Sequence, residues 1–542
     1  MTGLETAAPA SGEAAAPLPG LTLADEIDRL APGWGLDDLC RWPPDVFAFT
    51  SAALGDSGAY RLVVNPPEGH SWPPSRTTGE SWEAELREDA HVWAARAADD
   101  LPLDGDPALA SVQRLRDALR ASAAVPLADL DRPERWETLA HLLHLHALAD
   151  EAGAGAGIDT DTPFQRRAAV LLETTGSLAR LPTDRARVLP KLRPPASGIT
   201  LRSLSHHLAF DRSEVASRWV VAPPAARAGR NADRLTLLVL PHPSVVRASD
   251  FVPVVGPLEN MDEARFGFYE YAPQEPFDPA DALGLVARAR RHVGAIDALV
   301  LPEGALAEAE VPVLQQLLAE ADVPYLIAGV RQQARHGEGF GGNYAHLGSG
   351  GWQAPPQHKH HRWCLDASQV HQYHLGAALD PRRHWWEAIG VPRRRLTFVT
   401  VSPQLTICPL VCEDLARPDP VTDVVRSIAP TLVVALLLDG PQLAARWPAR
   451  YASVLADDPG CSVLTVTALG MTQRSQPPGH APSRGIALWK DPHRGLQQIT
   501  LAERARAVAL TAHVRPVEVM SADGRTGKPT AELVLSGIEQ IE

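Results

Sequence analysis

Apolar runs and amphipathic helical segments alternate along the middle of this chain. Short, continuous apolar runs are typical of buried strands, and segments with apolar residues three or four apart are typical of helices. In chain order, strand and helix patterns alternate at residues 235–240, 281–293, 297–301, 311–321 and 324–330. Further strands are expected at residues 396–401, 405–411, 431–438 and 461–469. This alternation predicts an α/β domain, a sheet covered by helices, over residues 196–525.

The region before this domain has a different pattern. Residues 21–195 are mostly helical in their spacing, for example at 80–98 and 135–149, and they contain no catalytic motif. We expect a helical accessory domain here, and binding of a protein partner is one interpretation of it. Residues 1–20, rich in Ala, Pro and Gly, are expected to be a disordered tail. Residues 526–542 are expected to be a C-terminal tail.

Composition excludes several classes of protein. With 65 acidic and 51 basic residues the formal net charge is −14, which disfavours general nucleic-acid binding. The N-terminus lacks the features of a signal peptide, and the apolar runs are too short to span a bilayer. Five scattered cysteines form neither a disulfide framework nor a CxxC…CxxC zinc site. We therefore expect a soluble cytoplasmic protein with no membrane partner, no metal and no cofactor.

Two reactive groups lie where predicted strands end. Glu303 directly follows Pro302 at the end of the strand 297–301, and Cys412 follows the strand 405–411. In α/β domains reactive groups gather beyond the carboxyl ends of strands. Taken singly, a buried Cys is most often a small core residue and a Glu at a strand end is most often solvated. Their combination points to a site.

A lysine lies between these two residues. Four of the 51 basic residues are lysines, and Lys359 is the one between Glu303 and Cys412. A lysine ammonium is a compact point charge whose pKa can move, whereas a guanidinium is permanently charged and planar. Lys359 is therefore the candidate cation of the site.

Four stretches in this order resemble the motifs of the nitrilase superfamily, the carbon–nitrogen hydrolases with a Glu–Lys–Cys triad. They are LPEGAL at 301–306, YLIAGV at 325–330 followed by Asn343-Tyr344-Ala345, HKHH at 358–361, and CEDL at 412–415. The resemblance covers residues 230–520, about one such domain. The tripeptide Cys412-Glu413-Asp414 is most similar to the motif of the glutamine-using amidase branch. No SGGxDS-type loop of an ATP pyrophosphatase follows, which argues against a complete glutamine-dependent NAD synthetase.

The resemblance implies a fold and a mechanism. The fold would be a four-layer α-β-β-α sandwich, and such domains commonly pair sheet to sheet, so a homodimer is expected. Cys412 would be the nucleophile of a thioester acyl-enzyme, with its pKa lowered by the ammonium of Lys359. Glu303 would transfer protons, and Lys359 with the backbone N–H of Glu413 would stabilise the oxyanion.

The substrate is left open at this stage. A small-molecule amide is favoured, nitriles and N-carbamoyl compounds are alternatives, and the acyl acceptor is either water or an amine. Asn343, His360, His361 and Glu387 are candidate residues of the substrate pocket. Glu413 stands where the family often has an aromatic residue, and residues 359–387 are rich in His and Trp, so the pocket rim is expected to differ from that of relatives.

Three other interpretations compete with this one. The histidines at 358, 360, 361, 371 and 374 could bind a metal, but they lack HExxH or Cys/His spacing and fit a polar pocket wall better. The Arg- and Trp-rich segment 382–395 could bind an anion or single-stranded nucleic acid, or be a solvated face. The domain could also be a non-catalytic or signalling binding module, for instance in a bacterial defence system. An intact Glu303–Lys359–Cys412 trio favours catalysis.

Overall fold

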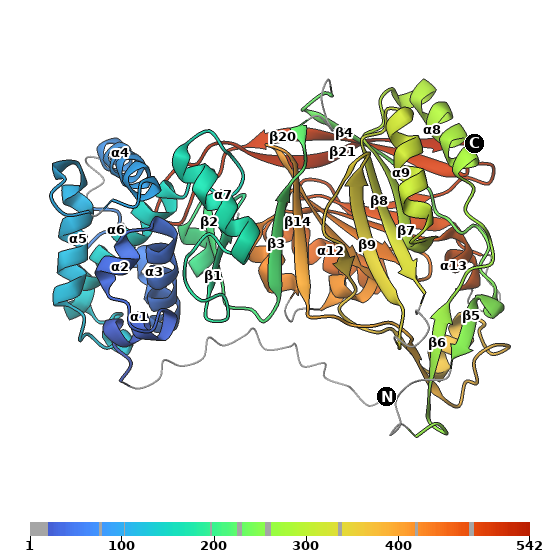
Figure 1. Ribbon diagram of the computed structural model, residues 1–542, viewed down its shortest axis with the longest axis horizontal. Coiled ribbons are helices and arrows are strands. Elements are labelled where there is room, and N and C mark those ends of the chain that lie inside the picture. Colours follow the sequence, from blue (N-terminus) through green and yellow to red (C-terminus); the bar gives the residue numbers. More distant parts are fainter. Residues whose placement is uncertain are drawn as a thin grey trace. The chain divides into compact units, whose positions relative to one another are not determined.

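The chain forms two compact units. The computed structural model describes residues 20–542 except 75–78, 102, 196–197, 225–229, 255–261, 334–338, 418–420 and 476–481. Unit 1 comprises Met1–Arg212 and Val519–Gly527, and unit 2 comprises Ser213–Glu518 and Lys528–Glu542 (Figure 1). The boundary falls after residue 212 and not after 195, because a two-stranded sheet beyond the last helix still belongs to unit 1. The predicted tail at 1–20 lies outside the described residues except for Gly20.

Unit 1 is built mainly from helices. Its described α-helices are α1 (Leu23–Leu30), α2 (Leu36–Cys40), α3 (Pro43–Ser57), α4 (Gly79–Ala98), α5 (Ala110–Ala121), α6 (Trp136–Ala152) and α7 (Pro163–Thr175). Strands β1 (Arg187–Pro190) and β2 (Leu208–Asp211) form an antiparallel pair. α3 and α6 pack against each other and are apolar around most of their circumference, which is the pattern of central, buried helices.

A fully buried arginine fixes the segment Val519–Gly527 within unit 1. Arg525 forms ion pairs with Asp150 (3.2 Å), Glu151 (2.7 Å) and Asp523 (2.9 Å), and it also donates to the carbonyl of Leu204. Asp150 accepts further hydrogen bonds from the backbone N–H groups of residues 206–208. Burial alone would raise the pKa of Asp150 and Glu151, but Arg525 and the other donors outweigh it. The pKa of Glu151 falls to about 2.

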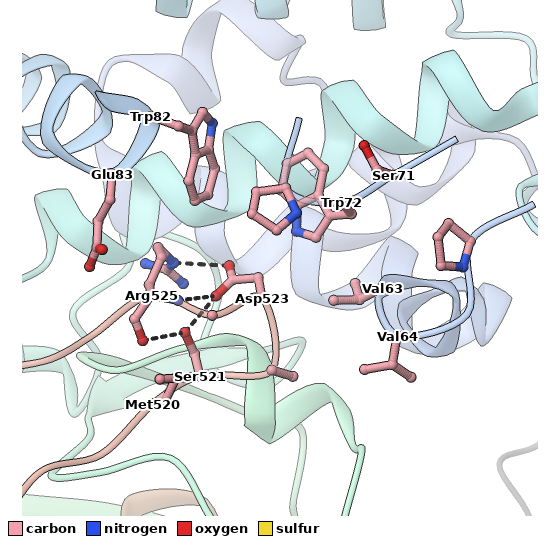
Figure 2. A pocket seen from close by; sticks show the side chains of 14 residues that line it. Val63, Val64, Ser71, Trp72, Trp82, Glu83, Met520, Ser521, Asp523 and Arg525 are labelled. Carbon is pink, nitrogen blue, oxygen red and sulfur yellow. Dashed lines mark hydrogen bonds and ion pairs between the residues drawn. The ribbon is translucent and has the colours of Figure 1, made fainter. Parts of the chain in front are cut away.

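The same unit contains a cavity of 710 Å³. Trp72 and Trp82 lie on one side of it and Met520, Ser521 and Asp523 on the other (Figure 2). The two indole rings meet nearly edge to face, with centroids 5.6 Å apart. Unit 1 thus has a pocket of its own.

Two large sheets dominate unit 2. The first has the strand order β10-β9-β8-β7-β4-β20-β21, with β11 also paired to β9, and the second has the order β19-β18-β17-β16-β15-β14-β3. The strands of the first sheet are β4 (Arg234–Val239), β7 (Ala298–Ala307), β8 (Tyr325–Gln332), β9 (Gly342–Ser349), β10 (Trp352–Gln353), β11 (Gln357–His358), β20 (Ala507–Val517) and β21 (Thr530–Ile541). Those of the second are β3 (Ala216–Val221), β14 (Arg395–Ser402), β15 (Leu405–Val411), β16 (Leu432–Leu437), β17 (Ser462–Thr467), β18 (Gly485–Lys490) and β19 (Gln497–Thr500).

A smaller sheet and several helices complete this unit. The smaller sheet has the order β12-β13-β6-β5, formed by β12 (Cys364–Leu365), β13 (His384–Glu387), β6 (Phe266–Tyr271) and β5 (Phe251–Val254). The described helices are α8 (Pro279–Val293), α9 (Glu310–Glu320), α10 (Ala367–Gln372), α11 (Asp423–Ile428), α12 (Trp447–Asp457) and α13 (Leu469–Arg474). None of the helices in the described parts of the chain is long and apolar enough to cross a membrane.

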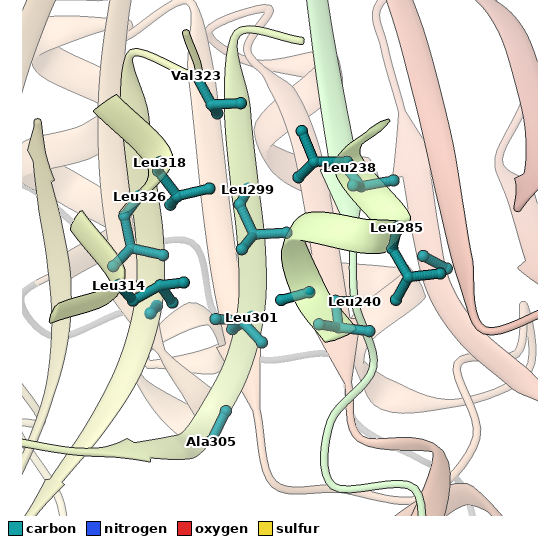
Figure 3. Packing of buried hydrophobic residues seen from close by; sticks show 14 of the residues in the cluster. Leu238, Leu240, Leu285, Leu299, Leu301, Ala305, Leu314, Leu318, Val323 and Leu326 are labelled. Carbon is teal, nitrogen blue, oxygen red and sulfur yellow. The ribbon is translucent and has the colours of Figure 1, made fainter. Parts of the chain in front are cut away.

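Helices α8 and α9 cover one face of the first sheet. Leu285 of α8 and Leu314 and Leu318 of α9 pack onto Leu299 and Leu301 of β7 (Figure 3). β7 contacts β16 and β17 of the second sheet, and α12 packs on β17 and β18. The central strands are buried on both faces, which explains why they read as continuous apolar runs.

The C-terminal segment differs from the prediction. Residues 526–542 were expected to be a tail, but residues 530–541 form β21, which pairs along its length with β20. The expectation was wrong because most polar residues of this segment, though not Glu532, occupy partly or fully exposed positions of the strand, where they do not prevent pairing.

Candidate active site

An irregularity in β7 places Glu303. The parallel pairing of β7 with β8 shifts register between Leu301 and Leu306, so Glu303 lies within a bulge. Gly329 of β8 lies against this bulge: a Cβ there would come within 2.3 Å of the Cα of Glu303. A glycine is therefore required at 329 for the two backbones to approach, and the bulge sets the direction of the Glu303 side chain.

Lys359 joins two carboxylates in a fully buried cluster. The strand β11 pairs with β9, and Lys359 follows it with its backbone N–H bonded to the carbonyl of Asn343 at 2.9 Å. The Nζ of Lys359 lies 2.8 Å from Oε1 of Glu303 and 2.6 Å from Oε2 of Glu387. The Nδ2 of Asn343 donates to both carboxylates, at 2.7 Å each. Each acid has one further donor: Leu438 N–H to Glu303 at 2.7 Å and Trp363 N–H to Glu387 at 3.2 Å.

Cys412 lies at the end of β15, in the first position of a 3₁₀ turn at Cys412–Ala416. Its φ is 48°, in the left-handed region that residues other than glycine rarely adopt. Such strained positions persist where the surroundings enforce them, and they are frequent at functional sites. Cys412 lines a cavity of 450 Å³, whereas Glu303, Asn343 and Glu387 line a much smaller one of 30 Å³; Leu438 borders both.

The charges around the thiol act in opposite directions. Burial raises the pKa of Cys412 and the carboxylate of Glu303 raises it further, while Lys359 and the Leu438 N–H lower it. The net pKa lies well above the ordinary value, so the resting group is a neutral thiol. Lys359 thus lowers the pKa of Cys412, as expected, but burial, which the sequence does not reveal, outweighs this effect.

The two other titratable partners are shifted as well. Burial raises the pKa of Glu303, and the nearby Glu387 adds to this, against the lowering effect of Lys359 and Asn343. Burial would lower the pKa of Lys359, but the two carboxylates outweigh it and leave the pKa well above its ordinary value. The cluster thus holds a permanent ammonium beside a carboxylate that accepts a proton more readily than a solvated one.

No family model and no curated protein matches the chain. Among solved structures it matches Nit3 of Saccharomyces cerevisiae, a nitrilase-superfamily member, with 10% identity, 52% of this chain and 90% of that chain covered, and a TM-score of 0.32. An amidase from Nesterenkonia sp. matches with 14% identity, coverage of 52% and 91%, and a TM-score of 0.32. The chain is similar to members of the nitrilase superfamily.

A third solved structure is matched over about half of its length. The glutamine-dependent NAD⁺ synthetase of Acinetobacter baumannii matches with 12% identity and a TM-score of 0.30, over 57% of this chain and 49% of that one. The match therefore spans about half the length of that protein.

Asp414 is a site residue that the sequence did not single out. It is fully buried and accepts hydrogen bonds from the backbone N–H of His360, at 3.0 and 3.2 Å, while its Oδ1 lies 3.0 Å from Nδ1 of His361. Asp414 is two residues after Cys412, and His360 directly follows Lys359. One carboxylate therefore ties the segment bearing the lysine to the turn bearing the thiol. The motif CED contained Asp414, but its role depends on a contact that the sequence does not show.

The predicted pocket residues fall into two groups. Asn343 and Glu387 hold Lys359, as described above. His360 and His361 line neither of the two cavities: the ring of His360 bonds to the Arg395 carbonyl at 2.9 Å, and that of His361 lies against Asp414. Glu413 borders the larger cavity, with its carboxylate paired to Arg417. Within the described residues, no group of three His, Cys, Asp or Glu side chains could hold a metal ion.

Proposed function

We propose that this protein is a cysteine-dependent hydrolase of non-peptide carbon–nitrogen bonds, with amides as substrates and unit 2 as a four-layer α-β-β-α sandwich of the nitrilase type. The observation that carries the proposal is the buried ammonium of Lys359, held at 2.8 Å by Glu303 and 2.6 Å by Glu387, in a site shared with a strained cysteine. Nitriles and N-carbamoyl compounds would suit the same nucleophile.

In the first half of the reaction the Sγ of Cys412 attacks the carbonyl carbon of the amide. Because the resting thiol is neutral, its proton passes to Glu303 as the S–C bond forms, and Glu303 then delivers that proton to the leaving nitrogen. The C–N bond breaks, ammonia or an amine departs, and a thioester remains on Cys412.

In the second half water replaces the departed amine. Glu303 takes a proton from the water as its oxygen attacks the thioester carbon, the C–S bond breaks, and the proton returns to sulfur. The sum is amide plus water giving carboxylic acid plus amine. In both halves the oxyanion forms beside the ammonium of Lys359 and the N–H of Glu413, and one such donor typically stabilises the transition state by about 3–4 kcal/mol. Glu387 and Asn343 keep the lysine in place.

A second candidate function is a binding module that has kept this fold, as in a signalling or bacterial defence protein. Unit 1 favours it, since a helical unit with a 710 Å³ cavity of its own contributes nothing to the chemistry above. A protein partner for unit 1, a homodimer paired sheet to sheet and a cytoplasmic location stay predictions.

The test is ammonia release from a broad panel of amides by the full chain and by Cys412→Ala. We expect release of ammonia by the wild type and none by the variant. When the reaction is quenched, intact mass spectrometry should detect an acyl adduct on the wild-type protein alone. Cys408→Ala is the matched control, since Cys408 is a buried cysteine within β15. Equal release by Cys412→Ala would refute the mechanism, and no release by the wild type would favour the binding module.

A further inference from the structure

The 450 Å³ cavity that opens on Cys412 has an aromatic wall. Five aromatic side chains line it: Trp363, Tyr373, Trp386, Trp447 and Tyr451. They come from the segments around β12, α10, β13 and α12, which are separated in sequence and brought together by the fold. Small-molecule sites commonly measure about 300–1,000 Å³, so this space suits a ligand larger than a simple aliphatic amide.

Part of this wall is fixed to the reacting groups. The backbone N–H of Trp363 donates to Glu387, the carboxylate that binds Lys359. The ring of Trp363 meets that of Tyr373 edge to face, with centroids 5.5 Å apart and an angle of 84°. The hydroxyl of Tyr373 donates to Asp439. These contacts hold the two rings in place beside the cavity.

The other part of the wall is carried by α12. Trp447 and Tyr451 are four residues apart and so share one face of the helix, with ring centroids 6.3 Å apart. The helix packs against β17 and β18 through other residues, among them Ala452 and Leu455. Both rings are partly exposed, so a ligand in the cavity could cover them.

The polar groups of the cavity indicate what else the ligand carries. Arg446 is paired with Asp439 and Arg417 with Glu413, so the acidic side chains are neutralised. A cationic ligand would meet these guanidinium groups and that of Arg362, which also lines the cavity. Three tryptophans, Trp363, Trp386 and Trp447, present the indole rings of this wall. The wall thus offers flat apolar faces, and its arginines offer hydrogen-bond donors.

We propose, on the basis of the hydrolase function above, that the substrate is an amide whose acyl group bears an uncharged or anionic aromatic ring. The ring would lie among the aromatic side chains, where edge-to-face and offset contacts favour an aromatic group over an aliphatic one of the same size. Acceptor substituents on the ring would bond to the guanidinium groups that line the cavity. The carbonyl carbon would then lie at Cys412.

The decisive comparison uses pairs of amides matched in size. We expect kcat/KM for benzamide and phenylacetamide to exceed that for cyclohexanecarboxamide and cyclohexylacetamide at least tenfold, and that for acetamide about a hundredfold. Trp447→Leu should reduce the aromatic preference severalfold. Val454→Ala, on the same helix but exposed, should leave it unchanged.

Binding separates this inference from the proposed function. Cys412→Ala should bind benzamide at least tenfold more tightly than cyclohexanecarboxamide by calorimetry. If acetamide or the cyclohexyl amides are hydrolysed with the same kcat/KM as the aromatic amides, the inference is overturned but the proposed hydrolase function is not. Preferential binding of the aromatic amide without hydrolysis by the wild type would overturn the hydrolase and leave the assignment of the cavity standing. Equal binding of the two amides would overturn that assignment.

Discussion

The two units each contain a buried cluster of one cation and several carboxylates, and the clusters behave in opposite ways. In unit 1, Arg525 pairs with Asp150, Glu151 and Asp523. In unit 2, Lys359 pairs with Glu303 and Glu387. The first cluster lowers the pKa of Glu151 to about 2, whereas the second leaves the pKa of Glu303 above its ordinary value.

The difference follows from the number of donors. A guanidinium has five N–H donors and stays charged, so Arg525 can satisfy several acids and a carbonyl at once. An ammonium has three donors, and Glu387 opposes the ionisation of Glu303. The cluster of unit 1 therefore fixes all its charges, which suits a structural role. The cluster of unit 2 keeps one carboxyl able to gain and lose a proton, which suits catalysis.

Glu303→Gln should have the largest effect of the variants considered, and it should act on kcat. Loss of a general acid–base group typically reduces the rate by about 10²–10⁴-fold, and we expect kcat to fall in that range while the fold persists. The fall in kcat is measured with the amide that the wild type hydrolyses fastest, and circular dichroism checks that the variant is folded. A variant with wild-type kcat would show that Glu303 is as structural as Glu151.

Arg525→Met should act on stability instead. It leaves three carboxylates buried without their cation, a change that typically destabilises a protein by about 3–5 kcal/mol. Urea unfolding of the full chain should show this loss. Arg382→Met, which removes an exposed arginine paired with Asp380, is the control and should unfold like the wild type. If Arg525→Met changes the free energy of unfolding only slightly, the cluster does not stabilise the fold.

Much of the α/β unit could be predicted from the sequence because its strands are short, apolar and bounded by helices. The helix expected at 281–293 is α8 (Pro279–Val293), and the strand expected at 324–330 is the start of β8 (Tyr325–Gln332). The C-terminal strand β21 was missed because eight of its twelve positions are partly or fully exposed, so its pattern resembles that of a polar tail.

The site was predicted less completely, for a different reason. Glu303, Lys359 and Cys412 each belong to a local motif, so the sequence identifies them as candidates. The roles of Glu387 and Asp414 depend on long-range contacts, since β13 reaches the site through its pairing with β6. The sign of the pKa shift of Cys412 depends on burial, which is a property of the folded chain.

Exchanging the two cations would sharpen the comparison further. Lys359→Arg keeps the charge but places a planar fork in a site built for a point charge, so we expect kcat to fall about 10²–10³-fold, as on loss of one oxyanion donor. Arg525→Lys should retain kcat and lose part of the stability, because an ammonium cannot supply all the hydrogen bonds of Arg525. Assays of both variants at 25 °C and urea unfolding check this. Similar losses of kcat in the two variants would contradict the distinction.

The pH dependence of hydrolysis is the finest test. Glu303 must be deprotonated to accept the thiol proton, and its pKa is raised by burial and by Glu387. The acid limb of kcat/KM should therefore lie above pH 4.5, the ordinary value for glutamic acid. Glu387→Gln removes the like charge, so the pKa of Glu303 falls and the limb should move to lower pH, by about one unit for a change of 1.4 kcal/mol in interaction energy. A shift of the limb to higher pH would contradict this. It would show that Glu387 acts mainly by positioning Lys359, because the ammonium of Lys359 lowers the pKa of Glu303.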